Sequence, residues 1–247
     1  MKLYCYYTKS HESLLNTFFL PSLKDDYKVI LKKGEQKCSK GSYKEEGWLE
    51  TTMGKVDFII AAILDNRNKL FLFSDPDIQF FRETEKYILK IAKDQDIVAQ
   101  RNDPSGKLCS GFFACRANEK TLNLWRDVRK FICNKEGDDQ DGLNYFLKLS
   151  ILTSPHHYFR KRMSIILSKR GLNYHKINWR YLPSFFFGGG MLSGRRWEPG
   201  MRLKIPKNIA MHHANWTFGI ENKITQLNLV RNICTGRKFV INSANNL

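Results

Sequence analysis

The chain has 247 residues, of which 42% are apolar and 13% aromatic, enough for the core of one large α/β domain or two small ones. Its 41 Lys and Arg against 24 Asp and Glu give a net charge of +17, which predicts attraction to polyanions without choosing among nucleic acid, anionic lipid and phosphorylated small molecules. No basic segment followed by an apolar run opens the sequence, and no apolar run approaches the ~18 residues of a membrane span. We therefore expect a soluble protein.

The first hundred residues alternate between strand and helix signals. The predicted elements are a strand over Lys2–Thr8, a helix over His11–Leu20, a strand over Tyr27–Leu31, a polar loop over 32–47, a helix over Trp48–Ile63 and a strand over Lys69–Phe73. We expect Pro21 to interrupt the first helix. Strand, helix, strand, helix, strand is the order of an α/β fold.

The second part of the chain continues this order before it becomes irregular. We predict a helix over Glu83–Ala92, strands over Asp96–Ala99 and Gly111–Arg116, a helix over Glu119–Ile132, a short helix from about Asp139 and a final helix over Ile220–Ile233. Beyond Pro155 the pattern is irregular up to that last helix. With no internal repeat or linker, we expect one domain over residues 1–247.

An apolar strand runs directly into two carboxylates at Ser74-Asp75-Pro76-Asp77, and the proline fixes the backbone between them. Two acidic side chains at the carboxyl end of a buried strand can hold Mg²⁺ or Mn²⁺ and leave coordination positions open for phosphate. In an open α/β sheet, this end of a strand is where ligands bind. The same four residues are also good turn formers, so a plain turn is the alternative.

Two further polar clusters follow. Asp138-Asp139-Gln140-Asp141 begins a predicted helix, with Asn144 one turn later, and helix capping alone explains such a cluster. Met211-His212-His213-Ala214-Asn215-Trp216 precedes the last helix, with Gly219 and Lys223 near its start. It combines a possible metal ligand, a glycine that lets backbone approach an anion and a lysine at a helix N-terminus that attracts phosphate. Each of these residues is unremarkable alone.

Together and in this order, the clusters resemble the nucleotide-diphospho-sugar transferases, glycosyltransferases of the GT-A type, with looser similarity to the glycogenin and bacterial galactosyltransferase group. Leu72 to Ile78 looks like the family's strand followed by Asp-x-Asp, and Ser110 to Ala117 resembles its Asn-Thr-Gly-Phe strand. The segment 139–144 is similar to Asp-Gln-x-x-x-Asn, and Leu182-Pro183 with Phe185 or Phe187 and Gly188 to Leu-Pro then Phe-x-x-Gly. His213, Asn215, Gly219 and Lys223 resemble the family's His-x-Asn, Gly and Lys ending.

The resemblance implies a single GT-A domain, Rossmann-like, with a mixed central sheet flanked by helices. Residues 1–100 would form its nucleotide- and metal-binding half, and residues 101–247 its acceptor half. Asp75, Asp77 and His213 would bind Mn²⁺ or Mg²⁺, and His213 is preferred to His212 because of its spacing to Asn215, Gly219 and Lys223. The two phosphates of the donor would complete the coordination of the cation.

The remaining site residues also follow from the resemblance. Gly219 and Lys223 would support the same phosphates, and Lys55 would face the donor. Tyr7 and Thr8 would hold the nucleotide base, although plain packing explains Tyr7 equally well. Near the donor sugar we expect Asp139, Gln140 and Asp103 as the catalytic candidates, with Asn144 holding the local geometry. Cys109-Ser110 stands where the family has Asn-Thr, which puts sugar contacts from those two positions in doubt.

The implied activity is metal-dependent transfer of a hexosyl or pentosyl unit from a UDP-sugar to a glycan, glycoprotein or glycolipid acceptor. A GDP-sugar is the less favoured donor, and the anomeric configuration would be retained. With no membrane anchor, we expect a bacterial or virus-encoded enzyme in the cytoplasm. A rival interpretation is a non-catalytic polyanion-binding module, motivated by the net charge and the basic residues between Arg160 and Arg170, but no nucleic-acid motif supports it. The same basic segment could be a solvated helix face or contact an anionic membrane.

Overall fold

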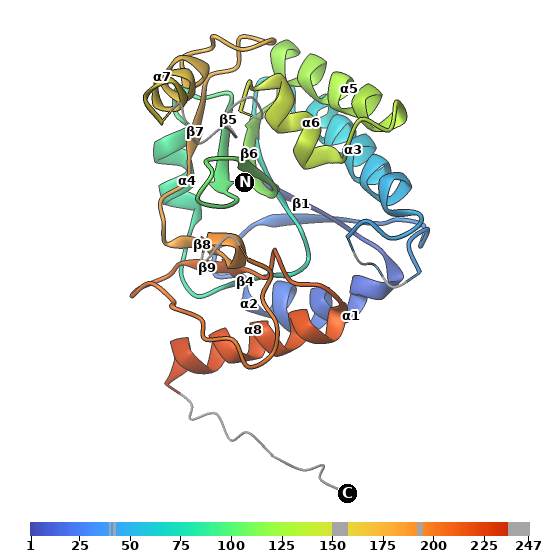
Figure 1. Ribbon diagram of the computed structural model, residues 1–247, viewed down its shortest axis with the longest axis vertical. Helices are drawn as coiled ribbons and strands as arrows, with labels where there is room; N and C mark the ends of the chain where they lie inside the picture. Colours follow the sequence, from blue (N-terminus) through green and yellow to red (C-terminus); the bar gives the residue numbers. More distant parts are fainter. Residues whose placement is uncertain (40, 42, 150–157, 192–194, 237–247) are drawn as a thin grey trace, which may run out of the picture.

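The computed structural model describes residues 1–39, 41, 43–149, 158–191 and 195–236, and for residues 158–161 it describes the backbone alone. The described residues form a large six-stranded mixed sheet and a small three-stranded sheet beside it (Figure 1). The large sheet has the strand order β2-β1-β3-β6-β5-β7 and the small one β4-β9-β8. The strands are β1 (Lys2–Tyr7), β2 (Lys28–Lys33), β3 (Leu70–Ser74), β4 (Ile78–Phe80), β5 (Ile97–Arg101), β6 (Leu108–Arg116), β7 (Trp179–Tyr181), β8 (Phe186–Gly188) and β9 (Met211–His213).

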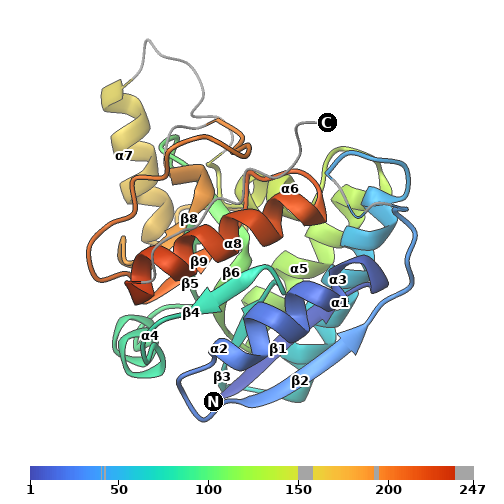
Figure 2. The ribbon, with the colours of Figure 1, turned by 90° about the horizontal axis from the view of Figure 1, so that it is seen from below.

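The helices cover both sides of the large sheet. They are α1 (Glu12–Leu14), α2 (Leu20–Ser22), α3 (Trp48–Asp65), α4 (Glu85–Ala92), α5 (Glu119–Cys133), α6 (Asp139–Phe146), α7 (Tyr158–Lys169) and α8 (Ile220–Thr235), with a π-helical turn over Leu15–Phe19 between α1 and α2. In Figure 1, α3, α5 and α6 lie together on one side of the sheet, and α1, α2 and α8 lie on the other. Viewed from below, α8 lies beside the N-terminal helical segment (Figure 2).

Strand β3 is buried on both faces, which explains its unbroken apolar run. Phe71 and Phe73 join the core under α3 and α5, where the Phe73 ring stacks on Phe113 at a centroid distance of 5.4 Å. Leu72 points to the opposite core, under the π-helical turn and α4. The strand is therefore held between two hydrophobic layers, and its carboxyl end is a rigid base for the two residues that follow it.

The observed elements match most of those predicted, and the α/β class is confirmed. Pro21 does not interrupt the first helix, because it lies in the first turn of α2, where a missing N–H costs no hydrogen bond. The region beyond Pro155 is more regular than predicted, since it contains α7, β7, β8 and β9. The three strands have only three residues each, too few to show an alternating pattern.

Among the described residues, no helix has both the length and the apolar composition needed to cross a bilayer.

Candidate active site

A cavity of about 450 Å³ opens where the ends of several distant segments meet. Its walls come from the carboxyl end of β1, from α3, from the link between β3 and β4, from β6, from the start of α6 and from the segment between β9 and α8. Of the residues predicted from sequence, the cavity wall contains Tyr7, Thr8, Lys55, Asp75, Asp77, Asp139, Gln140, His213, Gly219 and Lys223. Asp103 and Asn144 do not belong to it.

Backbone pairing brings Asp75, Asp77 and His213 together across 138 positions of sequence. The Asp75 N–H donates to the Gly111 carbonyl at 2.7 Å, and the Ala214 N–H donates to the Asp77 carbonyl at 2.9 Å. Antiparallel pairing of β4 with β9 places Ile78 opposite His213, so the preceding Asp77 lies beside the imidazole. Strand register therefore fixes the three side chains relative to one another.

These three residues fit a divalent cation. One ligand atom from each lies within 4.8 Å of the other two. Gly111 faces them, and a Cβ at this position would meet the Asp75 carboxylate and lie 2.6 Å from His213 Cε1, so the absence of a side chain keeps the space open. Carboxylate oxygen with one imidazole nitrogen is a donor set that suits Mn²⁺ and related ions.

Gln100 sets the orientation of His213. The His213 Nδ1 lies 2.9 Å from the Gln100 Oε1, while the Gln100 amide donates to the Phe186 carbonyl at 3.2 Å. Because the amide is committed to that carbonyl, its oxygen accepts the Nδ1 proton, and Nε2 faces Asp77 at 3.2 Å. His212 points elsewhere, 3.1 Å from Gln226 Oε1, so of the two histidines it is His213 that lies with Asp75 and Asp77.

Two lysines neutralise the buried carboxylates of the cavity. The Lys55 ammonium lies 3.0 Å from Asp75 and 2.9 Å from Asp139, so one cation is shared by two acids from different elements. Lys223 lies 2.6 Å from Asp77 on the opposite side. The result is a compact charged network in which Lys55 joins Asp139 to Asp75, Lys223 pairs with Asp77, and the carboxylates of Asp75 and Asp77 lie next to each other.

The pKa values of these groups reflect the competition between burial and pairing. Burial alone would lower the pKa of His213, but the Asp77 carboxylate and Cys109 together outweigh it and raise that pKa to about 10. Burial opposes ionisation of Asp77 too, yet Lys223 and His213 hold its pKa well below the ordinary value. Burial raises the pKa of Asp75 in spite of Lys55. The cavity therefore concentrates negative charge on Asp77.

The start of α8 forms the wall nearest Lys223. Gly219 occupies the N-cap position with φ of 75°, a left-handed conformation that favours glycine, and open space surrounds the position where a Cβ would stand. Lys223 lies one turn into the helix, its N–H bonded to the Gly219 carbonyl at 3.2 Å. Unpaired N–H groups at a helix start, a glycine and a lysine together suit a phosphate.

The start of α6 holds the acidic cluster. Asp138 caps the helix by accepting the Asp141 N–H at 2.9 Å, as the capping alternative predicted for this cluster. The neighbouring Asp139 has a different environment: its buried Oδ2 pairs with the Lys55 ammonium at 2.9 Å and has no other polar partner among the described residues. Such an oxygen keeps acceptor capacity for a hydroxyl group.

Asn144 and Asp103 have structural partners instead of cavity positions. Asn144 joins α6 to β6 by accepting the Leu108 N–H at 2.8 Å and donating to the Leu108 carbonyl at 2.9 Å. Asp103 accepts from the Ser105 N–H at 2.6 Å and from the Asn102 amide at 2.7 Å. Both residues shape the segments that carry the cavity wall.

Several residues in or beside the cavity were not singled out from sequence. Gln100, behind His213, is one: in the sequence it is only a polar residue directly after the apolar run Ile97-Val98-Ala99, and its full burial appears only in the structure. An aromatic contact across the cavity wall is another: the Tyr43 and Phe218 rings stack at 6.2 Å, and the Arg196 guanidinium lies 3.5 Å from the Phe218 centroid. Its three members come from segments with no periodic pattern, so no sequence rule connects them.

The chain belongs to the nucleotide-diphospho-sugar transferase family, whose model matches residues 15–227. None of the curated proteins matches the chain. Among solved structures, the crystal structure of the galactosyltransferase LgtC in complex with donor and acceptor sugar analogues is similar, with 10% sequence identity, a TM-score of 0.51 and 98% of each chain covered. The match confirms the GT-A fold class, and family and fold are those of glycosyltransferases.

Proposed function

We propose that the protein is a metal-dependent glycosyltransferase that moves a sugar from a UDP-sugar to a glycan, glycoprotein or glycolipid acceptor. The observation that carries the proposal is the convergence of Asp75, Asp77 and His213 within 4.8 Å, in the cavity that also contains Gly219 and Lys223. This is the set of groups that a nucleotide diphosphate with a divalent cation requires. We propose Mn²⁺, with Mg²⁺ as the alternative, and hold a GDP-sugar as the less favoured donor.

Asp75, Asp77 and His213 would hold the cation, and the bound cation supplies Lewis acidity toward the leaving diphosphate. Lys223 now pairs with Asp77. With Asp77 engaged as a ligand, Lys223 and the N–H groups that follow Gly219 become available to the two phosphates. Lys55 stays between Asp75 and Asp139, where it prevents repulsion between the metal side and the sugar side of the cavity.

Tyr7 and Thr8, at the end of β1, would contact the nucleotide base, because both line the cavity on the side of the first strand. Asp139 and Gln140 would hold the donor sugar, a role supported by the buried Asp139 Oδ2, whose one polar partner among the described residues is the Lys55 ammonium. We place Asp103 behind this sugar site, acting through the turn that it stabilises.

We also propose that transfer retains the anomeric configuration. Inversion needs a free carboxylate as general base on the acceptor side. Four carboxylates of the described cavity wall are already engaged, Asp75 and Asp139 with Lys55, Asp77 with Lys223 and Asp138 as a helix cap, which leaves the partly exposed Asp141, 4.0 Å from Lys107, as the one rival base there. The configuration of the product, observed by NMR from the start of the reaction, tests this point.

The two halves of the chain share one site in this proposal, within a single domain over residues 1–247. The half formed by residues 1–100 provides Asp75 and Asp77, and the half formed by residues 101–247 provides His213 and Lys223. Support comes from the large sheet, which joins β1, β2, β3 and part of β5 from the first half to β6 and β7 from the second. We assign acceptor binding to the second half.

The direct test is hydrolysis or transfer of a UDP-sugar with Mn²⁺ and with EDTA, for the wild type and for Asp77→Asn. We expect the wild type to be active with Mn²⁺ and inactive with EDTA. The activity of the variant should be lower by about 10³-fold or more, because the substitution removes a charged metal ligand that is also the partner of Lys223 and His213. Asp57→Asn, on the exposed side of α3, is the matched control and should keep full activity. Activity in EDTA, or an active Asp77→Asn, would refute the proposal.

A thermal-shift screen of nucleotide sugars, with and without Mn²⁺, identifies the donor. A ligand that binds only the folded state stabilises it by RT ln(1 + [L]/Kd), which is about 2.7 kcal/mol at a hundredfold excess over Kd. We expect a shift for UDP-sugars that requires Mn²⁺. A shift for GDP-sugars alone would change the assigned base, and shifts that ignore Mn²⁺ would contradict the metal site.

A further inference from the structure

Helix α7 presents an apolar stripe to solvent. Met163, Ile166 and Leu167 lie at the i, i+3, i+4 spacing of one helix face and are 41%, 37% and 41% exposed, and Leu172, just beyond the helix, is 59% exposed. The opposite face is already used, since Ile165 packs against the main core and Ser168 is fully buried, its hydroxyl close to Leu147. The outer stripe is therefore not needed to attach α7 to the fold.

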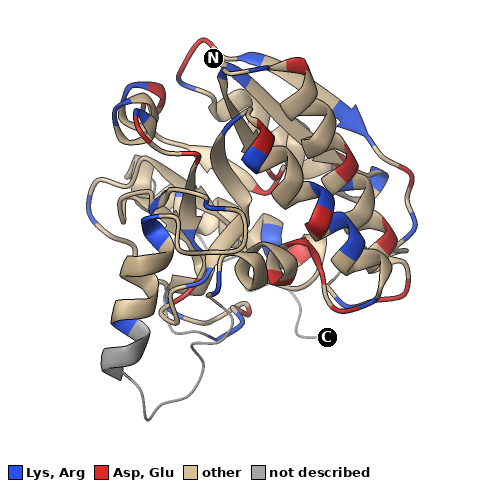
Figure 3. Ribbon diagram, turned by 90° about the horizontal axis from the view of Figure 1, so that it is seen from above, with Lys and Arg blue, Asp and Glu red and all other residues tan. Residues whose placement is uncertain are grey.

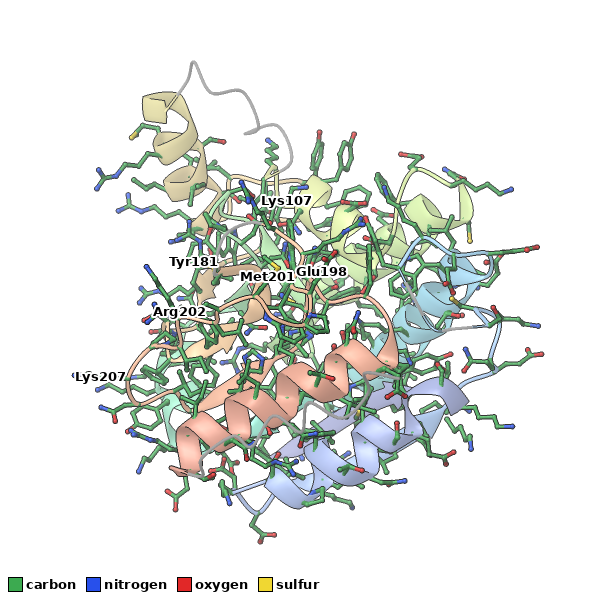
Figure 4. The ribbon with its side chains drawn as sticks, turned by 60° about the horizontal axis from the view of Figure 1, so that its bottom comes forward. Lys107, Tyr181, Glu198, Met201, Arg202 and Lys207 are labelled. Atoms are coloured by element: carbon green, nitrogen blue, oxygen red, sulfur yellow. The ribbon has the colours of Figure 1, made fainter. Side chains whose placement is uncertain are left out.

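The position of α7 leaves this stripe accessible. The helix stands at an outer corner of the molecule in two different views, and its side chains project away from the body in Figure 4, above the labelled Tyr181. A contiguous exposed apolar face on a protein surface marks a contact site more often than scattered single residues do.

Basic side chains border the apolar stripe. Figure 3 shows Lys and Arg but no Asp or Glu along α7. Arg162, Lys169, Arg170 and Arg180 border the apolar residues, and within the described part of the chain none of the four forms an ion pair with a carboxylate. Lys169, Arg170 and Arg180 also line a hollow of about 630 Å³ next to Ile166, where Asp94 is the one acidic residue among the described lining residues.

Cations lie close together at the hollow, so a bound anion would reduce the repulsion between them. The Lys169 ammonium lies 4.4 Å from the centroid of the Tyr181 ring and 5.4 Å from that of Trp179, and the Arg101 guanidinium lies 5.7 Å from the Tyr181 centroid. Burial lowers the pKa of Lys169, and the nearby Arg101 and Arg180 lower it further. The Tyr181 ring thus holds the cations of Lys169 and Arg101 close to each other, where a negative group would neutralise them.

We propose that this face of α7, defined by Met163, Ile166, Leu167 and Leu172 with the bordering Arg162, Lys169, Arg170 and Arg180, docks on the surface of an anionic membrane. The aliphatic side chains enter the boundary between headgroups and acyl chains, and the hollow receives phosphate headgroups. A nucleic acid fits this face less well, because nucleic-acid surfaces use aromatic stacking and hydrogen bonds to bases, not a stripe of Met, Ile and Leu. The inference does not depend on the catalytic proposal.

The test is co-sedimentation of the full chain with vesicles of phosphatidylcholine alone or mixed with phosphatidylglycerol. We expect binding to the anionic vesicles that falls sharply at about 1 M salt, where the Debye length is about 3 Å. Ile166→Ser combined with Leu167→Ser should weaken binding by about tenfold or more, since two half-exposed aliphatic groups no longer leave water. Arg170→Gln and Arg180→Gln should each weaken it by about fivefold.

Matched controls separate this face from the rest of the surface. Leu64→Ser on α3 and Leu89→Ser on α4, each 48% exposed in the wild type, and Lys86→Gln on α4 should leave vesicle binding unchanged. Hydrolysis of a UDP-sugar in the absence of vesicles should be the same in all these variants, so loss of docking is distinct from loss of catalysis. Equal binding to neutral and anionic vesicles, no binding at low salt, or unaltered binding by the α7 variants would overturn the inference. Capture of single-stranded RNA through these residues, without vesicle binding, would do the same.

Discussion

The charges of the cavity and the charges around α7 are arranged in opposite ways. In the cavity, acids and bases are buried or partly buried, and each contacts a partner of the other sign, as in the pairs Lys55 with Asp139 and Lys223 with Asp77. Around α7 the charges are basic and exposed, with no carboxylate partner among the described residues. The net charge of +17 is a sum over the whole chain and does not show this difference.

The comparison separates two uses of charge. The charges of a buried pair have lost their hydration, and the attraction between them offsets that cost in free energy. Removal of one partner therefore leaves a buried charge without hydration and without a counter-charge. Exposed charges keep their hydration and act at a distance, where salt screens them. We therefore expect large effects of single substitutions in the cavity, on stability as well as on activity, and small additive effects around α7.

The largest effect on stability should come from Lys55→Met. The substitution leaves the carboxylates of Asp75 and Asp139 without their shared cation, and we expect a loss of about 3 to 5 kcal/mol in the free energy of unfolding. Urea denaturation measures it. The matched control is Lys86→Met, which breaks the exposed pair with Glu83 and should cost less than about 1 kcal/mol. Equal losses in the two variants would contradict the contrast between buried and exposed charge.

Gly111→Ala should reduce metal affinity without removing any ligand. Its Cβ would meet the Asp75 carboxylate and the His213 ring, and displacement of either ligand typically costs about 10- to 100-fold in affinity. Titration of Mn²⁺ by calorimetry measures the change. Ser110→Ala, the neighbouring substitution in β6, adds no volume and should bind Mn²⁺ as the wild type does. An unchanged affinity in Gly111→Ala would place the cation elsewhere.

Asp138→Asn should change the pH dependence of stability. Burial first, then the charges of Asp139 and Asp141, raise the pKa of Asp138 to about 7. The folded state thus holds a proton that the unfolded chain loses near pH 4, and stability falls as pH rises between about 4 and 7. Asparagine caps a helix as well as aspartate does and carries no charge.

At pH 8 we expect the free energy of unfolding of Asp138→Asn to exceed that of the wild type by an amount on the order of 1 to 3 kcal/mol. The free energy of unfolding should also change less between pH 5 and pH 8 in the variant than in the wild type. Urea denaturation at the two pH values provides both numbers. Asp57→Asn, at an exposed position on α3, is the control for removal of an acidic group. A variant with the same pH difference as the wild type would show that Asp138 ionises normally.

The sequence was most informative where local pattern and site coincide. The apolar run ending at Asp75 identified β3 and the acidic end of the strand, and the resemblance of the spacing from His213 to Lys223 to the family's ending selected the histidine that lies beside Asp77. Both signals are contained within about ten residues of chain. The short-range pattern also predicted α3, α5 and α8, whose amphipathic or apolar spacing extends over several turns.

Features that depend on tertiary packing were not predictable in the same way. The bond between Gln100 and His213 joins residues 113 positions apart, and β7, β8 and β9 exist because neighbouring strands pair with them. The sequence did show the basic residues of α7, but not which side faces solvent, since a stripe of Met, Ile and Leu is usually read as a buried face. Only the packing of Ile165 and Ser168 shows that the opposite side is buried.

The central claim is that Asp75, Asp77 and His213 hold one divalent cation together with a nucleotide diphosphate. The most direct measurement is anomalous diffraction from crystals grown with Mn²⁺ and UDP. We expect a single strong anomalous peak at coordination distance, about 2.2 Å, from all three side chains, with the diphosphate bound to it and to Lys223. A diphosphate in the cavity without a peak at these residues, or a peak at another site, would contradict the claim.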